Sequence, residues 1–178
     1  PEKLESSIEE LADSIKKSQM FFIPGGFSMS DEPDGSAKFI ANVLRNEKVS
    51  SAIEYLLDEN GQDGLILGIC NGFQALIKTG LLPYGKIMKL EETSPTLTYN
   101  EVGRHISKII PTVGITNDGP WLKYIEKDVC YNVPISHGEG RFVADDNCIE
   151  ELVKNNQIAF KYVINPNGSK CDIEGIMD

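Results

Sequence analysis

The chain has 178 residues, 40% of them hydrophobic, which is enough for one buried core and predicts a single domain over residues 1–178. Its 27 acidic residues outnumber the 17 basic ones, and the resulting net charge of −10 argues against a nucleic-acid or membrane partner. The apolar runs are far shorter than a membrane span, and four cysteines without C-x-x-C spacing predict reduced thiols rather than a zinc site, so we expect a cytoplasmic protein.

Helices and a strand alternate in the first third of the chain. Apolar residues at helical spacing predict a helix over 4–15, and the apolar run Met20–Ile23 predicts a buried strand that ends in a Pro-Gly-Gly loop. Helical spacing predicts two more helices, over 36–44 and 49–57.

A second buried strand is predicted by the apolar run 64–69. This run leads directly into Cys70, and helical spacing resumes over 73–79. A strand, a sharp turn and a helix are therefore expected to meet at this cysteine.

The second half of the chain is richer in residues that favour β-structure. Strands are predicted at 106–116, 129–136 and 158–163. Alternating strands and helices followed by β-rich segments predict an α/β fold, with an open, mostly parallel sheet flanked by helices and an antiparallel β extension.

Cys70 lies in a G-x-C-x-G pattern with Gly68 and Gly72. This pattern is the cysteine version of a nucleophile elbow, in which small residues flank a nucleophile because a Cβ would clash in so tight a turn. The helix that follows directs its N-terminal N–H groups at the sulfur, which favours a reactive thiolate. A buried, inert cysteine is the alternative interpretation, since the pattern also occurs by chance.

Two further segments are candidates for a binding site. Pro24–Ser28 follows a predicted strand, and its adjacent glycines expose backbone N–H groups that could form an oxyanion hole together with the N–H of Asn71. The alternative is a plain strand-ending turn. Ser136–Phe142 gathers polar groups between glycines that suit the ammonium and carboxylate ends of a zwitterion, or else a solvated turn; His137 could also act as a base for Cys70.

Together, Pro24–Ser28, Gly68–Gln74 and His137–Phe142 resemble the class I (triad) glutamine amidotransferases. Within that family the chain is similar to the amidotransferase domain of phosphoribosylformylglycinamidine synthases in their large single-chain form. The similarity to that form extends to Asp31–Lys38, Ser94–Thr98, Gly103–His105 and Asn165–Ser169. The resemblance covers nearly the whole chain and implies the flavodoxin-like α/β fold of this family.

The resemblance also implies roles for individual residues. In this family a cysteine attacks the side-chain amide of glutamine, forms a glutamyl thioester and releases ammonia, and Cys70 matches that nucleophile. Gly26 and Asn71 match the positions whose backbone N–H groups stabilise the oxyanion. The positions that match glutamine-binding residues are Gly25, Phe27, Gln74, His137, Gly138 and Glu139.

By the same resemblance, the ammonia passes to a synthetase portion of the same enzyme that makes an intermediate of purine biosynthesis. The implied partners are therefore L-glutamine and that synthetase portion. ATP and Mg²⁺ are implied for the synthetase, whereas no metal or cofactor is expected in this domain, where no G-x-x-x-x-G-K-[ST] phosphate loop occurs.

The sequence departs from the family pattern at its ends. The family's catalytic His and Glu follow the equivalent of Gly175–Ile176, and its fold begins upstream of anything that matches Pro1. We therefore expect a domain truncated at both ends, without the base and its orienting acid, that turns over glutamine weakly or not at all by itself.

Two other readings of the sequence remain. One is a different cysteine-nucleophile hydrolase on the same α/β scaffold. The other is a non-catalytic docking domain, which the retention of Cys70 and both flanking glycines opposes.

Overall fold

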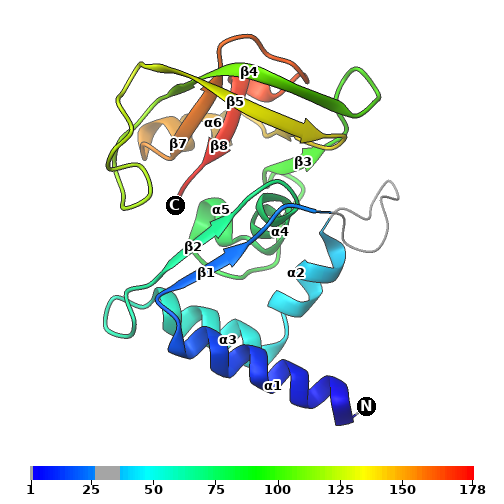
Figure 1. Cartoon of the computed structure of the whole chain (residues 1–178), viewed down its shortest axis with the longest axis vertical. Helices are drawn as coiled ribbons and strands as arrows, with labels where there is room; N and C mark the ends of the chain where they lie inside the picture. Colours follow the sequence, from blue (N-terminus) through cyan, green and yellow to red (C-terminus); the bar gives the residue numbers. More distant parts are fainter. Residues whose placement is uncertain (1, 27–36) are drawn as a thin grey trace. The chain divides into compact units, whose positions relative to one another are not determined.

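The computed structural model describes residues 2–26 and 37–178 of the chain (Figure 1). The chain divides into two compact units, residues 1–89 and residues 90–178, each with a hydrophobic cluster of its own. Among the described residues, no helix is both long enough and apolar enough to cross a membrane.

The first unit is built from helices around a short parallel pair of strands. Its elements follow the order α1 (Glu2–Lys17), β1 (Met20–Ile23), α2 (Lys38–Leu44), α3 (Glu47–Leu57), β2 (Leu65–Gly68), α4 (Asn71–Thr79) and α5 (Leu81–Tyr84). In the parallel pair, Met20 lies opposite Leu65 and Ile23 lies opposite Gly68. The two strands therefore end side by side, which places the segment after β1 next to the turn after β2.

The core of the first unit lies where α1 and α3 pack together and against the strands (Figure 1). Ile15 of α1 and Ile53 and Leu56 of α3 are almost completely buried. Burial of side chains of this size contributes roughly 1.5–3 kcal/mol each relative to exposure. The helical spacing of these apolar residues is what aims them at one interior.

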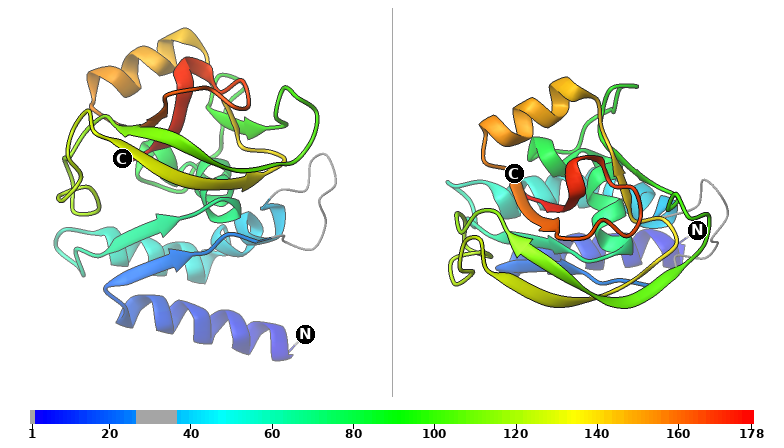
Figure 2. Two further views of the ribbon diagram at one scale, coloured as in Figure 1. Left: turned by 45° about the horizontal axis from the view of Figure 1, so that its top comes forward. Right: turned by 90° about the horizontal axis from the view of Figure 1, so that it is seen from above.

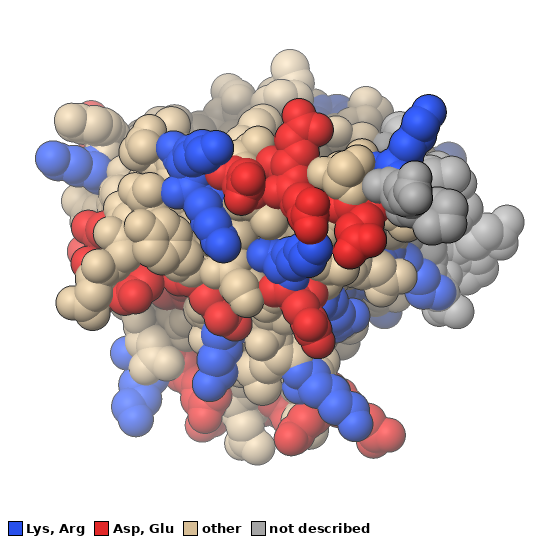
Figure 3. Space-filling view, turned by 90° about the horizontal axis from the view of Figure 1, so that it is seen from below, with Lys and Arg blue, Asp and Glu red and all other residues tan. Residues whose placement is uncertain are grey.

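Charged side chains of both signs are interspersed on the face of the molecule seen in Figure 3. Lys48 of α3 lies 3.7 Å from Glu5 and 2.5 Å from Glu9 of α1. Exposed ion pairs of this kind contribute little to stability. The association of α1 with α3 therefore rests mainly on the apolar contacts beneath them.

The second unit is mostly antiparallel β-structure. Its elements follow the order β3 (Thr96–Thr98), β4 (Ile106–Gly114), β5 (Cys130–His137), β6 (Arg141–Val143), α6 (Asp146–Lys154), β7 (Ile158–Tyr162), the short 3₁₀ helix η1 (Lys170–Asp172) and β8 (Ile173–Ile176). One sheet has the order β5-β4-β7-β8, and β3 pairs with β6. β4 and β5 form a long antiparallel ribbon (Figure 2) that opens with Ile106 opposite His137.

The structure confirms the predicted α/β class, with a parallel pair, helices and antiparallel sheets. Among the described strands, parallel pairing is confined to β1 and β2. The principal strands and helices lie within a few residues of their predicted positions, whereas α5, α6, β3, β6 and β8 were not predicted. Of these, α6 has a recognisable start, because the side chain of Asp145 accepts a hydrogen bond from the N–H of Cys148 at 2.7 Å.

Candidate active site

Cys70 occupies a strained turn between β2 and α4. Its backbone has φ 53° and ψ −106°, a conformation that residues other than glycine rarely adopt. The turn is closed by hydrogen bonds from the Gly72 N–H to the Ile69 carbonyl at 2.9 Å and from the Gln74 N–H to the Cys70 carbonyl at 3.0 Å. The side chain of Cys70 is exposed. Strain of roughly 1–3 kcal/mol held at an exposed nucleophile is typical of a functional site.

The two glycines of the pattern are required by close packing around this turn. A Cβ on Gly72 would lie 2.0 Å from the carbonyl oxygen of Ile23, at the end of β1. A Cβ on Gly68 would lie 2.7 Å from the backbone of Gly72. The end of β1 is thus packed directly on the first turn of α4, and the cysteine is held where these elements meet.

The segment after β1 lies beside the cysteine. A Cβ on Gly25 would come within 3.2 Å of the Cys70 Cβ and 3.5 Å of the Ile69 carbonyl oxygen. Gly26 has φ 151°, and among residues 2–26 and 37–178 no atom lies within 4 Å of where a Cβ would be. The predicted site residue Phe27 and the rest of its segment to residue 36 lie outside the described residues.

Asn71 and Gln74 are buried together in the first turn of α4. They are only 6% and 7% exposed, and the side-chain amide of Asn71 donates to the side-chain oxygen of Gln74 at 3.1 Å. Because the Asn71 side chain is turned into the helix, it is the backbone N–H of this residue that suits an oxyanion. N–H groups in the first turn of a helix have no intrahelical acceptor.

The segment His137–Gly140 follows β5 in the second unit and is organised by Asn100, which is only 2% exposed. The Asn100 backbone N–H donates to the Gly138 carbonyl at 2.9 Å, and its side-chain amide donates to the His137 carbonyl at 2.8 Å. Its side-chain oxygen lies 3.0 Å from the Nδ1 atom of His137. Gly140 is needed here, because a Cβ would lie 2.4 Å from that same Nδ1.

Burial lowers the pKa of His137, and the nearby His105 lowers it further. His105 itself is exposed, and its Nε2 lies 2.9 Å from the hydroxyl of Ser136. His137 is therefore a predominantly neutral imidazole at neutral pH, which can act as a hydrogen-bond acceptor or donor but not as a fixed cation.

Two neighbouring segments hold the segment His137–Gly140 in place through hydrogen bonds. The Ser169 hydroxyl accepts a hydrogen bond from the Phe142 N–H at 3.0 Å, and the Asn167 carbonyl accepts one from the Glu101 N–H at 3.0 Å. The exposed Glu101 also pairs with Arg141 at 3.2 Å. The segments around residues 100 and 167 thus form the scaffold of His137–Gly140.

The structure places the predicted site residues in two groups. Gly25, Gly26, Cys70, Asn71 and Gln74 belong to the first unit. His137, Gly138 and Glu139 belong to the second. Sequence reasoning missed Asn100, because a single polar residue ahead of a strand gives no sign that it is buried and contacts a segment nearly forty residues away.

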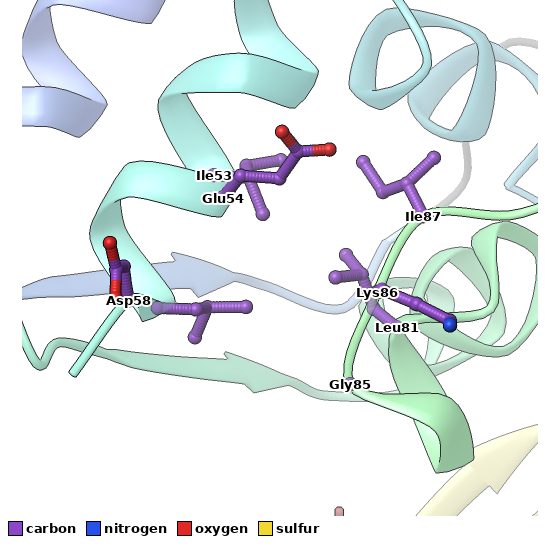
Figure 4. Close-up of a pocket in the computed structure, with 8 residues that line it drawn as sticks. Ile53, Glu54, Asp58, Leu81, Gly85, Lys86 and Ile87 are labelled. Atoms are coloured by element: carbon purple, nitrogen blue, oxygen red, sulfur yellow. The ribbon is translucent and has the colours of Figure 1, made fainter. Parts of the chain in front are cut away.

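A separate hollow of about 190 Å³ lies in the first unit between the end of α3 and the segment after α5 (Figure 4). It is lined by Ile53, Glu54, Leu57, Asp58, Leu81, Gly85, Lys86 and Ile87. None of the predicted site residues that the structure describes is among them.

Comparison with known proteins gives the class. A family model described as a CobB/CobQ-like glutamine amidotransferase domain matches residues 4–178. The chain belongs to this family of glutamine amidotransferase domains. It is also similar to a solved structure, "Structure of PurLQS from Thermotoga maritima", with 32% sequence identity over 90% of this chain and a TM-score of 0.66. The chain spans 63% of the PurLQS chain that it matches.

Proposed function

We propose that this chain hydrolyses L-glutamine at Cys70 and supplies the ammonia to a phosphoribosylformylglycinamidine synthase. The observation that carries the proposal is the strained, exposed Cys70 at the β2–α4 turn, with Gly25 packed beside it. Membership in the glutamine amidotransferase family supports L-glutamine as the substrate for this nucleophile. The similarity to PurLQS supports the purine-biosynthetic setting.

The reaction at Cys70 has two halves. The thiolate sulfur attacks the side-chain carbonyl carbon of glutamine, and the C–N bond of the tetrahedral intermediate breaks as the nitrogen takes up a proton and leaves as ammonia. Water then attacks the thioester carbonyl, which releases glutamate and restores the thiol. Each half passes through an oxyanion, for which we assign the backbone N–H groups of Gly26 and Asn71.

The remaining predicted residues are assigned to binding glutamine. Gly25 and Phe27 belong to the segment after β1, and Gln74 belongs to the first turn of α4. We assign the other contacts to the group His137, Gly138 and Glu139, whose polar atoms suit the charged ends of an amino acid.

His137 is assigned to binding rather than to proton transfer. A general base works best when its pKa lies near the operating pH, and burial lowers the pKa of His137 away from that range. The other histidine, His105, is exposed and bonded to Ser136. We therefore assign the proton transfers to neither histidine, and we expect this chain by itself to form the thioester slowly and to turn over glutamine weakly.

The partner of the proposed reaction is the synthetase portion of the same enzyme, which would use the ammonia together with ATP and Mg²⁺. In that reaction the oxygen of a formyl amide on a ribonucleotide is replaced by the nitrogen of an amidine. Binding of the nucleotide, ATP and Mg²⁺ is assigned to the synthetase, and the setting of purine biosynthesis favours the cytoplasm.

The proposal is tested in the complete enzyme with Cys70→Ala, beside Cys130→Ala as a matched control at an exposed cysteine of β5. We expect Cys70→Ala to abolish synthesis with glutamine and to leave synthesis with added ammonia intact, while Cys130→Ala leaves both unchanged. Glutamine-dependent synthesis that survives Cys70→Ala would overturn the proposal and favour a docking role for this chain.

A further inference from the structure

The side-chain amide of Asn100 uses every hydrogen-bonding position it has. Its nitrogen donates to the carbonyl oxygens of Arg104 at 3.0 Å and His137 at 2.8 Å. Its oxygen lies 3.0 Å from the His137 Nδ1 and accepts from the Gly140 N–H at 3.4 Å. A buried Asn with two donors and two acceptor sites in use is fully satisfied.

These partners fix which end of the amide is which. A backbone N–H can only donate, so the atom facing Gly140 must be the amide oxygen. A backbone carbonyl can only accept, so the atom facing the carbonyls of Arg104 and His137 must be the amide nitrogen. The reversed orientation would oppose donor to donor and acceptor to acceptor at a residue that is 2% exposed, where unsatisfied groups cost roughly 1–3 kcal/mol each.

The orientation of Asn100 in turn fixes the proton on His137. The Asn100 oxygen has no hydrogen to give, so the contact at 3.0 Å is a hydrogen bond only if the His137 Nδ1 carries the proton. In the neutral ring the other nitrogen, Nε2, then keeps its lone pair. Among the described residues, Nε2 of His137 is a buried atom for which no hydrogen-bond partner is found.

We propose that Asn100 is a positioning residue, which holds His137 in its Nδ1–H form so that Nε2 accepts a hydrogen bond from an N–H group of bound glutamine. The assignment of the proton stands on the geometry of the second unit alone, whereas the identity of the ligand rests on the proposed function. Glutamine carries N–H donors at its ammonium and at its amide, and either complements a lone pair. The lowered pKa of His137 agrees with this role, because a protonated Nε2 could not accept.

Gly140 is part of the same arrangement. The absence of a Cβ lets the ring of His137 lie over this residue, since a Cβ would come within 2.4 Å of Nδ1 and 2.5 Å of Cε1. Gly140 thus leaves the space that the ring of His137 occupies, and the side-chain oxygen of Asn100 accepts the hydrogen bond from the Nδ1 of that ring. The segment Asn165–Ser169 holds this arrangement through its bonds to Phe142 and Glu101.

The first test is the tautomer of His137, read from nitrogen NMR spectra of the isotope-labelled full chain without ligand. The chain has 2 histidines, so a His105→Gln variant suffices to assign their signals. We expect the Nδ1–H form of His137 in the wild type and a shift toward Nε2–H in Asn100→Ala. Asn132→Ala, at an exposed asparagine of β5, should change nothing.

The second test is the affinity for glutamine, measured as protection of Cys70 against alkylation. We expect protection to require roughly tenfold more glutamine in Asn100→Ala, the usual effect of losing one well-placed hydrogen bond, with the rate of alkylation by a plain thiol reagent unchanged.

The outcomes separate the two proposals. An Nε2–H form of His137 in the wild type would overturn the role of Asn100 whatever the variants do, and so would an Asn100→Ala chain with wild-type tautomer and affinity. If the wild type shows the Nδ1–H form but glutamine gives no protection, the assignment of glutamine as the ligand fails instead. The wild-type spectrum decides the first point even if Asn100→Ala does not fold.

Discussion

Replacing Gly72 with alanine should push the end of β1 off the first turn of α4. The added Cβ would lie 2.0 Å from the Ile23 carbonyl oxygen, 2.8 Å from its carbonyl carbon and 3.0 Å from its Cβ. Most of these atoms are backbone atoms, so the contact cannot be relieved by a rotation of one side chain. Overpacking of this kind costs about 1–3 kcal/mol, and relief by movement of β1 would also disturb its pairing with β2.

The helix propensity of alanine works in the opposite direction. Alanine is favoured over glycine within a helix by about 1 kcal/mol, less at the first turn where Gly72 lies. We therefore expect a net loss of about 1–3 kcal/mol in the free energy of unfolding, which for a chain of this length lowers Tm by roughly 2–4 °C per kcal/mol. The movement should also slow alkylation of Cys70 about tenfold or more, because the turn that presents the sulfur is displaced.

The assay is urea unfolding followed by circular dichroism, together with the rate of Cys70 alkylation under native conditions. Gly138→Ala is the matched control, because no atom of the described part of the chain lies within 4 Å of its added Cβ, and we expect its stability to change by less than about 0.5 kcal/mol. A Gly72→Ala chain with the stability and the alkylation rate of the wild type would refute the packing of β1 on the cysteine turn.

Two further predictions concern the second unit. In Gly140→Ala the new Cβ displaces the His137 ring, so protection of Cys70 by glutamine should weaken about tenfold, as in Asn100→Ala, while plain alkylation stays unchanged; unaltered protection would contradict the role of this ring. Burial raises the pKa of Glu174, so over a range of pH the folded state holds a proton that the unfolded state has given up. The resulting contribution to the stability of the fold is complete at low pH and is lost as the pH rises through the folded-state pKa. Glu174→Gln should therefore be more stable than the wild type at pH 7, with a gap that closes toward pH 4 in urea titrations; a gap that is constant with pH would show that the carboxyl is not the cause.

Local features of the sequence predicted much of the first unit. The run Met20–Ile23 is a strand with the predicted bounds, although Met20 and Phe22 are exposed rather than buried as predicted. The turn at Cys70 was likewise predictable from Gly68 and Gly72, since a Cβ on Gly68 would lie 2.7 Å from the backbone of Gly72. Both inferences depend on neighbours within a few residues.

The elements that escaped prediction depend on distant partners. β3 and β6 are three residues each, too short for any periodic pattern, and they pair across more than forty residues of sequence with Leu97 opposite Phe142. Asn100 likewise acquires its role from His137 and Gly140, which the sequence places far from it. A polar residue in a loop is usually exposed, and nothing in one sequence distinguishes the buried exception.

The most direct test of the central claim is the intact mass of this chain after incubation with a diazo-ketone analogue of glutamine, beside Cys70→Ala and Cys130→Ala. We predict a single adduct that maps to Cys70, is blocked by free glutamine, is absent from Cys70→Ala and is retained in Cys130→Ala. A chain whose Cys70 reacts with a plain thiol reagent but never with the analogue, or an adduct that free glutamine does not block, would contradict a glutamine site at Cys70.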